Sequence, residues 1–194
     1  DVRALEALAA AQTSSPGPVS PADPSGGEEL VFDLYDPGAA APADRRLKIY
    51  RLGTPLTLAR VLPLLSLLGL QVLDESPYEV SLADGPPTWI YDFGLRFPPG
   101  VDVAGVSSEH ILAALDDLWH ARVDEDGFMA LVVQAGLTSK QVVILRAYAG
   151  YLRQAGTPFS QGYIESTLRE NPRIVRLLVE LFETRFDPQR YAGE

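Results

Sequence analysis

Residues 88–97 read TWIYDFGLRF, a stretch in which large apolar side chains recur at every second position. Successive side chains of a β-strand point to opposite faces, so this spacing predicts a strand. One face carries three aromatic residues and a leucine: Trp89, Tyr91, Phe93 and Leu95. The other face carries Ile90, Asp92, Gly94 and Arg96. We expect the aromatic face to line a core beneath helices, and Gly94 to mark a bulge or a close backbone approach.

Three segments upstream of this strand show similar alternation. ELVFDLYD (29–36) and RRLKIYRL (45–52) are rich in aromatic and branched residues and predict an antiparallel hairpin with a long turn. Residues 70–83 alternate on both sides of a Ser-Pro pair, which predicts one bent strand or two short ones. A helix is expected between the second and third segments, with Thr54 as N-cap, Pro55 at its first position and Gly69 at its end. The predicted order is β-β-α-β-β.

The apolar spacing becomes helical after residue 106. A short helix is expected over residues 128–136, ending at Gly136. Helix starts are predicted at capping residues: Ser107 or Ser108, Ser139, Ser160, and Asn171 followed by Pro172. The fold class is therefore α+β, an antiparallel sheet with helices followed by an all-helical segment.

The N-terminal region differs from the rest in composition. Residues 1–11 are rich in Ala and Leu and predict a short helix, whereas residues 12–27 consist mainly of Pro, Ser, Gly and other small or polar residues. Such a segment buries too little apolar surface to offset its ordering entropy and is typical of a linker. Because the chain starts at Asp1, we expect a piece of a longer polypeptide or a processed chain.

Composition restricts the classes of function. The chain has 194 residues, 46% of them hydrophobic, and a net charge of −10, which disfavours binding to nucleic acid. It has no cysteine and two histidines, so disulfides, a cysteine nucleophile and a three-histidine metal site are excluded. The longest apolar run, residues 61–70, is too short to cross a bilayer. We expect a soluble, cytoplasmic protein.

The most site-like feature is the strand-to-helix corner YRLGTPLT (50–57). Gly53 permits a close backbone approach, Arg51 adds a cation, and the N–H groups after Thr54 suit an anionic group. An ordinary tight corner between a strand and a helix is the alternative interpretation.

Other polar residues favour structural roles. His110 and His120 lie on one predicted helix, and a hydrolase using either of them is the weakest of three functional hypotheses. Acidic residues cluster at 116–117 and at 124–126, where a solvated helix end is favoured over a cation site. Arg146 and Arg153 share a helix face, with Tyr148 and Tyr151 nearby. They could bind an anion or form ion pairs with acidic side chains, and we favour the ion pairs.

Several strings together resemble one enzyme family. LKIYRLGTPLTLARVLPLLSLLGLQVLDESPYEV, WIYDFGL and LRAYAGYLRQAGTPFSQGYIE occur in the order found in large bacterial NAD-specific glutamate dehydrogenases. The resemblance covers about residues 29–188 and places this piece just upstream of the catalytic domain. It implies an ACT-like (ferredoxin-like) module over residues 28–106, whose second helix continues to about 123, and a helical motif over 124–194. Residues 1–27 would be a helix remnant and flexible linker.

The resemblance also implies that this fragment and the rest of the parent enzyme have different functions. The parent enzyme would deaminate L-glutamate to 2-oxoglutarate and ammonia with NAD, whereas this fragment would be a non-catalytic regulatory and assembly segment without catalytic, cofactor or metal residues. In ACT domains that bind amino acids, the ligand usually lies at the corner that corresponds to Leu52, Gly53 and Thr54 here. An amino-acid sensor is therefore the alternative function.

The resemblance implies partners of two kinds, the remaining domains of the same chain and further copies in a homo-oligomer. One helical stripe, Leu177, Leu178, Leu181 and Phe182, exceeds what a small sheet needs, so we expect it to pack on the catalytic domain or on another copy.

Overall fold

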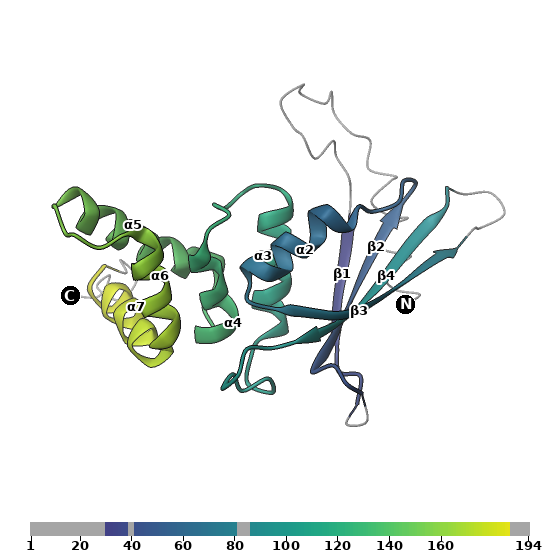
Figure 1. Cartoon of the computed structure of the whole chain (residues 1–194), viewed down its shortest axis with the longest axis horizontal. Helices are drawn as coiled ribbons and strands as arrows, with labels where there is room; N and C mark the ends of the chain where they lie inside the picture. The colour runs from purple at the N-terminus through teal and green to yellow at the C-terminus, as the bar shows by residue number, and fades with distance from the viewer. Residues whose placement is uncertain (1–29, 39–40, 81–85, 187–194) are drawn as a thin grey trace, which may run out of the picture. The chain divides into compact units, whose positions relative to one another are not determined.

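The structure is a computed structural model that describes residues 30–38, 41–80 and 86–186 (Figure 1). The expected N-terminal helix and linker lie outside these residues. The described residues up to 66, together with 70–97, form one compact unit, and residues 67–69 and those from 98 onward form another. The expected domain limits near residues 27, 106 and 123 stay predictions.

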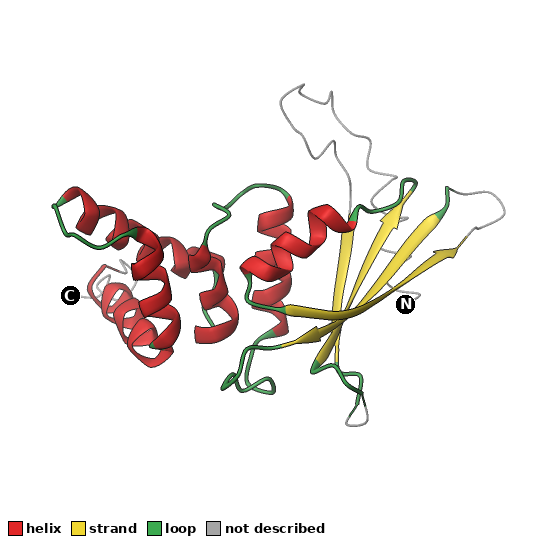
Figure 2. Ribbon diagram, viewed as in Figure 1, coloured by secondary structure: helices red, strands yellow, loops and turns green. Residues whose placement is uncertain are grey.

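The described strands of the first unit form one antiparallel sheet (Figure 2). In chain order they are β1 (Leu30–Tyr35), β2 (Arg45–Leu52), β3 (Gln71–Val80) and β4 (Thr88–Arg96), and their spatial order is β1-β2-β4-β3. The predicted hairpin is confirmed, because β1 and β2 pair antiparallel from Leu30 opposite Arg51 to Tyr35 opposite Arg46. β3 is a single strand with a register irregularity between Val72 and Asp74.

The TWIYDFGLRF segment forms β4, with its aromatic face in the core as predicted. Phe93 and Leu95 are fully buried and Tyr91 nearly so. The ring centroids of Trp89 and Tyr91 are 6.4 Å apart and those of Tyr91 and Phe93 are 6.5 Å apart, both in stacked arrangements. β4 is paired on both sides, and this central position explains why its alternation is the clearest in the chain.

Helix α2 (Leu58–Leu67) starts four residues after Thr54, so the prediction of Thr54 as N-cap and Pro55 as first helical residue is wrong. The intervening backbone is held by tertiary contacts instead. The Leu56 N–H donates to the Tyr91 hydroxyl at 2.7 Å, and the Arg51 guanidinium donates to the Pro55 carbonyl at 3.1 Å. The Tyr91 hydroxyl takes the N–H that a Thr54 cap would bind, and Arg51 occupies a carbonyl that a helix starting at Pro55 would use for its own hydrogen bond.

The second unit consists of helices. They are α3 (Ser108–Trp119), the short 3₁₀ helix η1 (Gly127–Ala130), α4 (Leu131–Ala135), α5 (Ser139–Gln154), α6 (Gln161–Glu170) and α7 (Pro172–Phe186). η1 and α4 replace the single short helix expected over 128–136, and Gly136, at φ +68°, ends α4 as predicted. Phe128, Met129, Leu131 and Val132 of this pair are completely or almost completely buried. α5, α6 and α7 pack around these residues.

Two of the four predicted caps are confirmed, and a third predicted helix start is confirmed by its first residue. Ser107 caps α3 and Ser160 caps α6 through their hydroxyls, and Pro172 is the first residue of α7. The predicted cap Ser139 is wrong, because Thr138 caps α5 and forms a reciprocal capping box with Gln141. Thr138 and Ser139 both carry a hydroxyl, but only Thr138 has a Gln three positions later, which completes the capping box.

Candidate functional site

The corner between β2 and α2 contains the four residues singled out from the sequence. Gly53 has φ +82°, a conformation that glycine adopts without strain, and the space beside its Cα is open. Its N–H donates to the Pro87 carbonyl at 2.8 Å, and its carbonyl accepts from Nε1 of Trp89 at 3.3 Å. Leu52 pairs with Thr88 in the sheet. Thr54 is exposed.

The polar groups of this corner bind one another. Arg51 is only 8% exposed and holds the Pro55 carbonyl, while the Leu56 N–H is taken by Tyr91. The N–H groups of Gly53 and Leu56 are therefore not directed at an external anion. Sequence reasoning missed Tyr91, which lies 35 positions from Leu56 and carries no local signal for this role. Effector binding at Arg51, Leu52, Gly53 and Thr54 stays a prediction.

A second polar cluster lies on the sheet face opposite the aromatic residues. Nε of Arg46 donates to Oδ1 of Asp92 at 2.9 Å, and its Nη2 donates to Oδ1 of Asp74 at 2.8 Å. The Tyr35 hydroxyl donates to the other oxygen of Asp92 at 2.8 Å. Lys48 lies 5.0 Å from the centroid of the Tyr35 ring. The cluster thus connects all four strands.

The environment of this cluster shifts two pKa values. Hydrogen bonding to Asp74 and Asp92 raises the pKa of Arg46 above its usual value. Burial, followed by the hydrogen bond to Asp92, raises the pKa of Tyr35. Both shifts favour the protonation states already present at neutral pH. Together with the hydrogen bonds that join the four strands, these shifts are typical of a structural ion-pair network.

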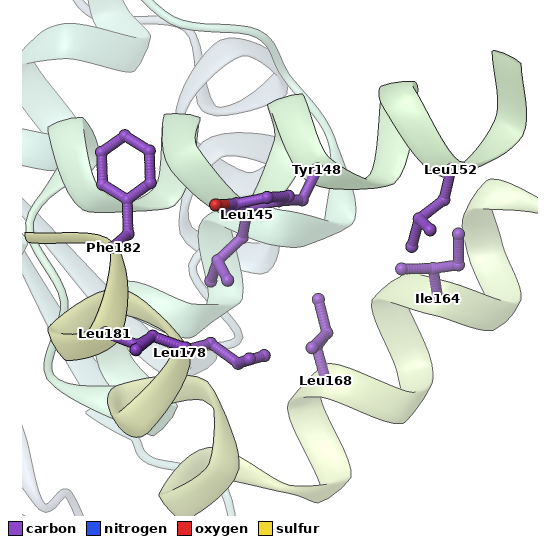
Figure 3. Close-up of a pocket in the computed structure, with 8 residues that line it drawn as sticks. All are labelled: Leu145, Tyr148, Leu152, Ile164, Leu168, Leu178, Leu181 and Phe182. Carbon is purple, nitrogen blue, oxygen red and sulfur yellow. The ribbon is translucent and has the colours of Figure 1, made fainter. Parts of the chain in front are cut away.

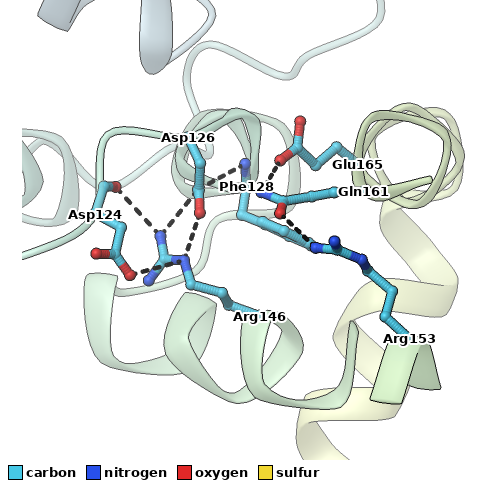
Figure 4. Close-up of polar contacts among 7 residues, drawn as sticks. All are labelled: Asp124, Asp126, Phe128, Arg146, Arg153, Gln161 and Glu165. Atoms are coloured by element: carbon cyan, nitrogen blue, oxygen red, sulfur yellow. Dashed lines mark hydrogen bonds and ion pairs between the residues drawn. The ribbon is translucent and has the colours of Figure 1, made fainter. Parts of the chain in front are cut away.

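Arg146 is fixed by an ion-pair network in the helical unit (Figure 4). Its guanidinium donates to both oxygens of Asp126, at 2.6 and 2.9 Å, and contacts Oδ2 of Asp124 at 3.5 Å. The hydrogen bond with Asp126 raises the pKa of Arg146. Asp126 is also the N-cap of η1, where it accepts from the Phe128 N–H at 3.1 Å. The ion-pair interpretation of Arg146 is confirmed.

Arg153, its expected companion, has a different partner. It donates to the side-chain oxygen of Gln161 at 3.1 Å, and Gln161 donates to Glu165 at 2.8 Å (Figure 4). The two arginines therefore do not share one anion site. Asp126 also departs from the expected solvated helix end, since its side chain is only 15% exposed.

The remaining candidates have local partners. Asp116 and Asp117 form ion pairs with Arg122. Nδ1 of His110 lies 3.1 Å from the Gly136 carbonyl, and Nδ1 of His120 lies 2.9 Å from the Asp116 carbonyl. Among the described residues, no group of three or more His, Asp or Glu side chains could hold a metal ion. Within the same residues, no helix is long and apolar enough to span a membrane.

The described helices also form an apolar groove with a volume of about 310 Å³ (Figure 3). It lies between α5, α6 and α7 and is lined by Leu145, Tyr148, Leu152, Ile164, Leu168, Leu178, Leu181 and Phe182. The Tyr148 and Phe182 rings meet edge to face with centroids 6.0 Å apart. The sequence indicated the α7 side of this groove as an apolar stripe, but not the α6 side, which is supplied by only two residues.

Comparison with protein families assigns both units. Residues 29–107 match the family model described as glutamate dehydrogenase, ACT3 domain, and residues 123–188 match glutamate dehydrogenase, helical motif 3. With the antiparallel sheet and the helices that follow it, these matches define the class of structure. It is an α+β chain in which an ACT domain is followed by a helical segment.

Curated relatives identify the family more closely. NAD-specific glutamate dehydrogenases of Mycobacterium tuberculosis, Pseudomonas aeruginosa and Halomonas elongata are 42%, 40% and 38% identical over 88%, 81% and 87% of this chain. The chain belongs to the glutamate dehydrogenase family, which confirms the resemblance noted in its sequence. It spans only 11%, 10% and 10% of the length of these three proteins.

Proposed function

We propose that this chain is a non-catalytic regulatory and assembly segment of a longer NAD-specific glutamate dehydrogenase. The parent polypeptide would convert L-glutamate with NAD to 2-oxoglutarate and ammonia, and would bind NAD outside these residues. The observation that carries this proposal is the presence, in one short chain, of an ACT domain and a helical motif described for glutamate dehydrogenase. The relatives named for that activity are roughly ten times longer.

The side-chain chemistry supports a structural role. The best candidates for ionic chemistry, Arg46 and Arg146, are engaged by Asp92 and Asp126 within their own units. The chain has two lysines, and one of them, Lys48, lies over the Tyr35 ring. These contacts stabilise the fold instead of presenting a general acid or base to a substrate.

An activity assay tests this division of labour. We expect the purified 194-residue chain to produce no NADH from NAD and L-glutamate, whereas the full-length polypeptide that contains it does. The full-length enzyme of Pseudomonas aeruginosa serves as the positive control. Glutamate-dependent NADH formation by the isolated chain would disprove the non-catalytic role. An inactive full-length polypeptide would disprove the proposed parent activity.

An amino-acid sensor is the second candidate function. The open space beside Gly53, next to the exposed Thr54, favours it. A screen of amino acids by thermal unfolding tests it, because a ligand at 100 times its dissociation constant stabilises the folded state by about 2.7 kcal/mol. Gly53→Val should abolish that stabilisation. If no amino acid raises the unfolding temperature, the corner is not a sensor site.

Location and partners follow from the same proposal. We place the parent enzyme in the cytoplasm, as a homo-oligomer in which this segment contacts other domains of its own polypeptide. Light scattering of the full-length polypeptide would give the oligomeric state, and a monomer would contradict the assembly role.

A further inference from the structure

The groove between α5, α6 and α7 is nearly free of polar groups. Seven of its lining side chains are aliphatic or phenyl groups, and Tyr148 supplies the eighth (Figure 3). Sites for small metabolites combine apolar walls with several convergent polar groups that fix orientation. An amino acid or a nucleotide would find no partner here for its charges. The groove therefore suits apolar side chains, as in the docking of a helix into a groove.

Helix α7 extends this surface beyond the groove. Ile174, Leu177, Leu178 and Leu181 follow the spacing i, i+3, i+4, i+7 and are 53%, 62%, 41% and 64% exposed. Such residues share one helix face. The core of the unit uses another face of α7, where Val175 and Val179 are buried. α7 thus has a second apolar face that its own unit leaves open, and contiguous surfaces of this kind mark interaction sites.

The charge around this surface is positive. Residues 139–186 contain seven Lys or Arg and four Glu, and because Arg146 is neutralised by Asp126 outside this range, an excess of two positive charges remains in a chain whose net charge is −10. Arg173 precedes the stripe, and Arg185 follows Leu181 by four residues on the same face. Within the described part of the chain, no carboxylate forms an ion pair with either arginine. A partner with acidic side chains would supply the missing negative charge.

We propose that the groove and the α7 stripe receive an amphipathic helix with aliphatic side chains on one face and acidic residues at its flanks. Its source is a segment of the longer polypeptide outside these 194 residues, an assignment that depends on the proposed function. The relatives are about ten times longer than the matched region, so most of the chain available for docking lies outside it. A second copy docked symmetrically would bring two positive borders together, which is unfavourable.

Binding of synthetic helices tests the chemistry of the groove. The probes are two fluorescein-labelled amphipathic peptides of about 18 residues with the same leucine face, one flanked by Glu and one by Lys. We expect the Glu peptide to bind the 194-residue chain at least about tenfold more tightly than the Lys peptide, measured by fluorescence anisotropy. Equal binding of the two peptides, or binding of neither, would overturn the proposal.

Matched variants locate the binding. Leu181→Glu should weaken binding of the Glu peptide at least about tenfold. Arg185→Glu should also weaken this binding and should make it less dependent on salt concentration. Val143→Glu is the control, because Val143 is a 46% exposed apolar residue of α5 that does not line the groove. Circular dichroism checks that each variant keeps its helices. Equal losses in Leu181→Glu and Val143→Glu would show that the peptide binds elsewhere.

Photo-crosslinking tests the source of the helix. A photoreactive phenylalanine derivative replaces Leu181 in the full-length polypeptide, and mass spectrometry identifies the linked peptide. We expect the link to fall in an acidic amphipathic segment of the same polypeptide beyond these 194 residues. A link to the groove of a second copy, or no link, would overturn the proposal. Glutamate-dependent NADH formation by the same sample reports separately on the proposed function, so the two ideas fail independently.

Discussion

At the scale of single residues, Gly94 shows how a small side chain permits a polar cluster on the sheet. A Cβ atom at this position would lie 2.5 Å from Oδ2 of Asp74 and 3.2 Å from Nη1 of Arg46. Arg46 is directly opposite Gly94 in the register of β2 and β4, so its guanidinium crosses the space that a larger residue would fill. The expected close backbone approach at Gly94 is therefore wrong, because the close atoms belong to side chains. The other expectation, a bulge, agrees with the register irregularity of β3 between Val72 and Asp74, since Asp74 lies opposite Gly94.

Gly94→Ala should therefore displace Asp74 from Arg46. We expect a loss of about 1 kcal/mol in the free energy of unfolding, because a charge-assisted hydrogen bond is broken on a partly exposed surface. Denaturant titration measures this change. In the Asp74→Ala background the closest contact is gone and only Nη1 of Arg46, 3.2 Å away, has to shift, so Gly94→Ala should cost clearly less than in the wild type. Equal losses in both backgrounds would contradict this explanation.

Tyr35 makes the stability of the folded protein depend on pH in the alkaline range. Its raised pKa means that the folded protein retains the phenolic proton after the unfolded chain has lost it. The unfolded state then binds fewer protons, so stability falls as the pH rises through about 10. Tyr35→Phe should cost about 1 kcal/mol at neutral pH. This difference from the wild type should shrink between about pH 9 and 11 in denaturant titrations, whereas a constant difference would refute the linkage.

At the scale of elements, the sequence identified the correct capping residue wherever no other residue competes for the cap. Ser107 and Ser160 cap α3 and α6 as expected from sequence alone. Thr54 and Ser139 do not cap, for two different physical reasons. Distant Tyr91 takes the Leu56 N–H that a Thr54 cap would bind, and the neighbouring Thr138 completes a capping box at α5. The first reason is tertiary and invisible to local patterns, whereas the second is visible in the spacing of Thr138 and Gln141.

Asp126 joins two elements by capping η1 and binding Arg146 of α5. Asp126→Ala should lower the free energy of unfolding by about 2–3 kcal/mol, because it removes a cap and a bidentate pair with largely buried partners. Asp126→Asn keeps an acceptor for the Phe128 N–H and should cost less. Thermal and denaturant unfolding measure both changes.

Asp124 provides the matched control for this prediction. Its side chain is 77% exposed and its contact with Arg146 is 3.5 Å long. Asp124→Ala should change stability by less than about 0.5 kcal/mol. A loss as large as that of Asp126→Ala would mean that general loss of negative charge near Arg146, and not the cap and the short pair, is responsible.

At the scale of the whole molecule, charge and apolar surface are unevenly distributed. The region 139–186 is positive and carries exposed leucines on α7, although the chain as a whole is strongly acidic. The chain is about one tenth of the length of its relatives. A surface that packs against other parts of the same polypeptide becomes an open apolar face with a positive border when the segment is taken alone.

The sequence by itself determined the β-β-α-β-β order, the core face of TWIYDFGLRF, the helical second half and the family. Periodicity and most caps depend on residues within a few positions of one another, so they can be recognised from the sequence alone. Only the tertiary structure decided that Arg46 binds Asp92, that the Tyr91 hydroxyl binds the Leu56 N–H, and that α6 closes a groove with α5 and α7. The pair Arg46 and Asp92 is 46 positions apart, and Leu56 and Tyr91 are 35 apart. Contacts at such separations arise from strand register and helix packing, which local sequence does not encode.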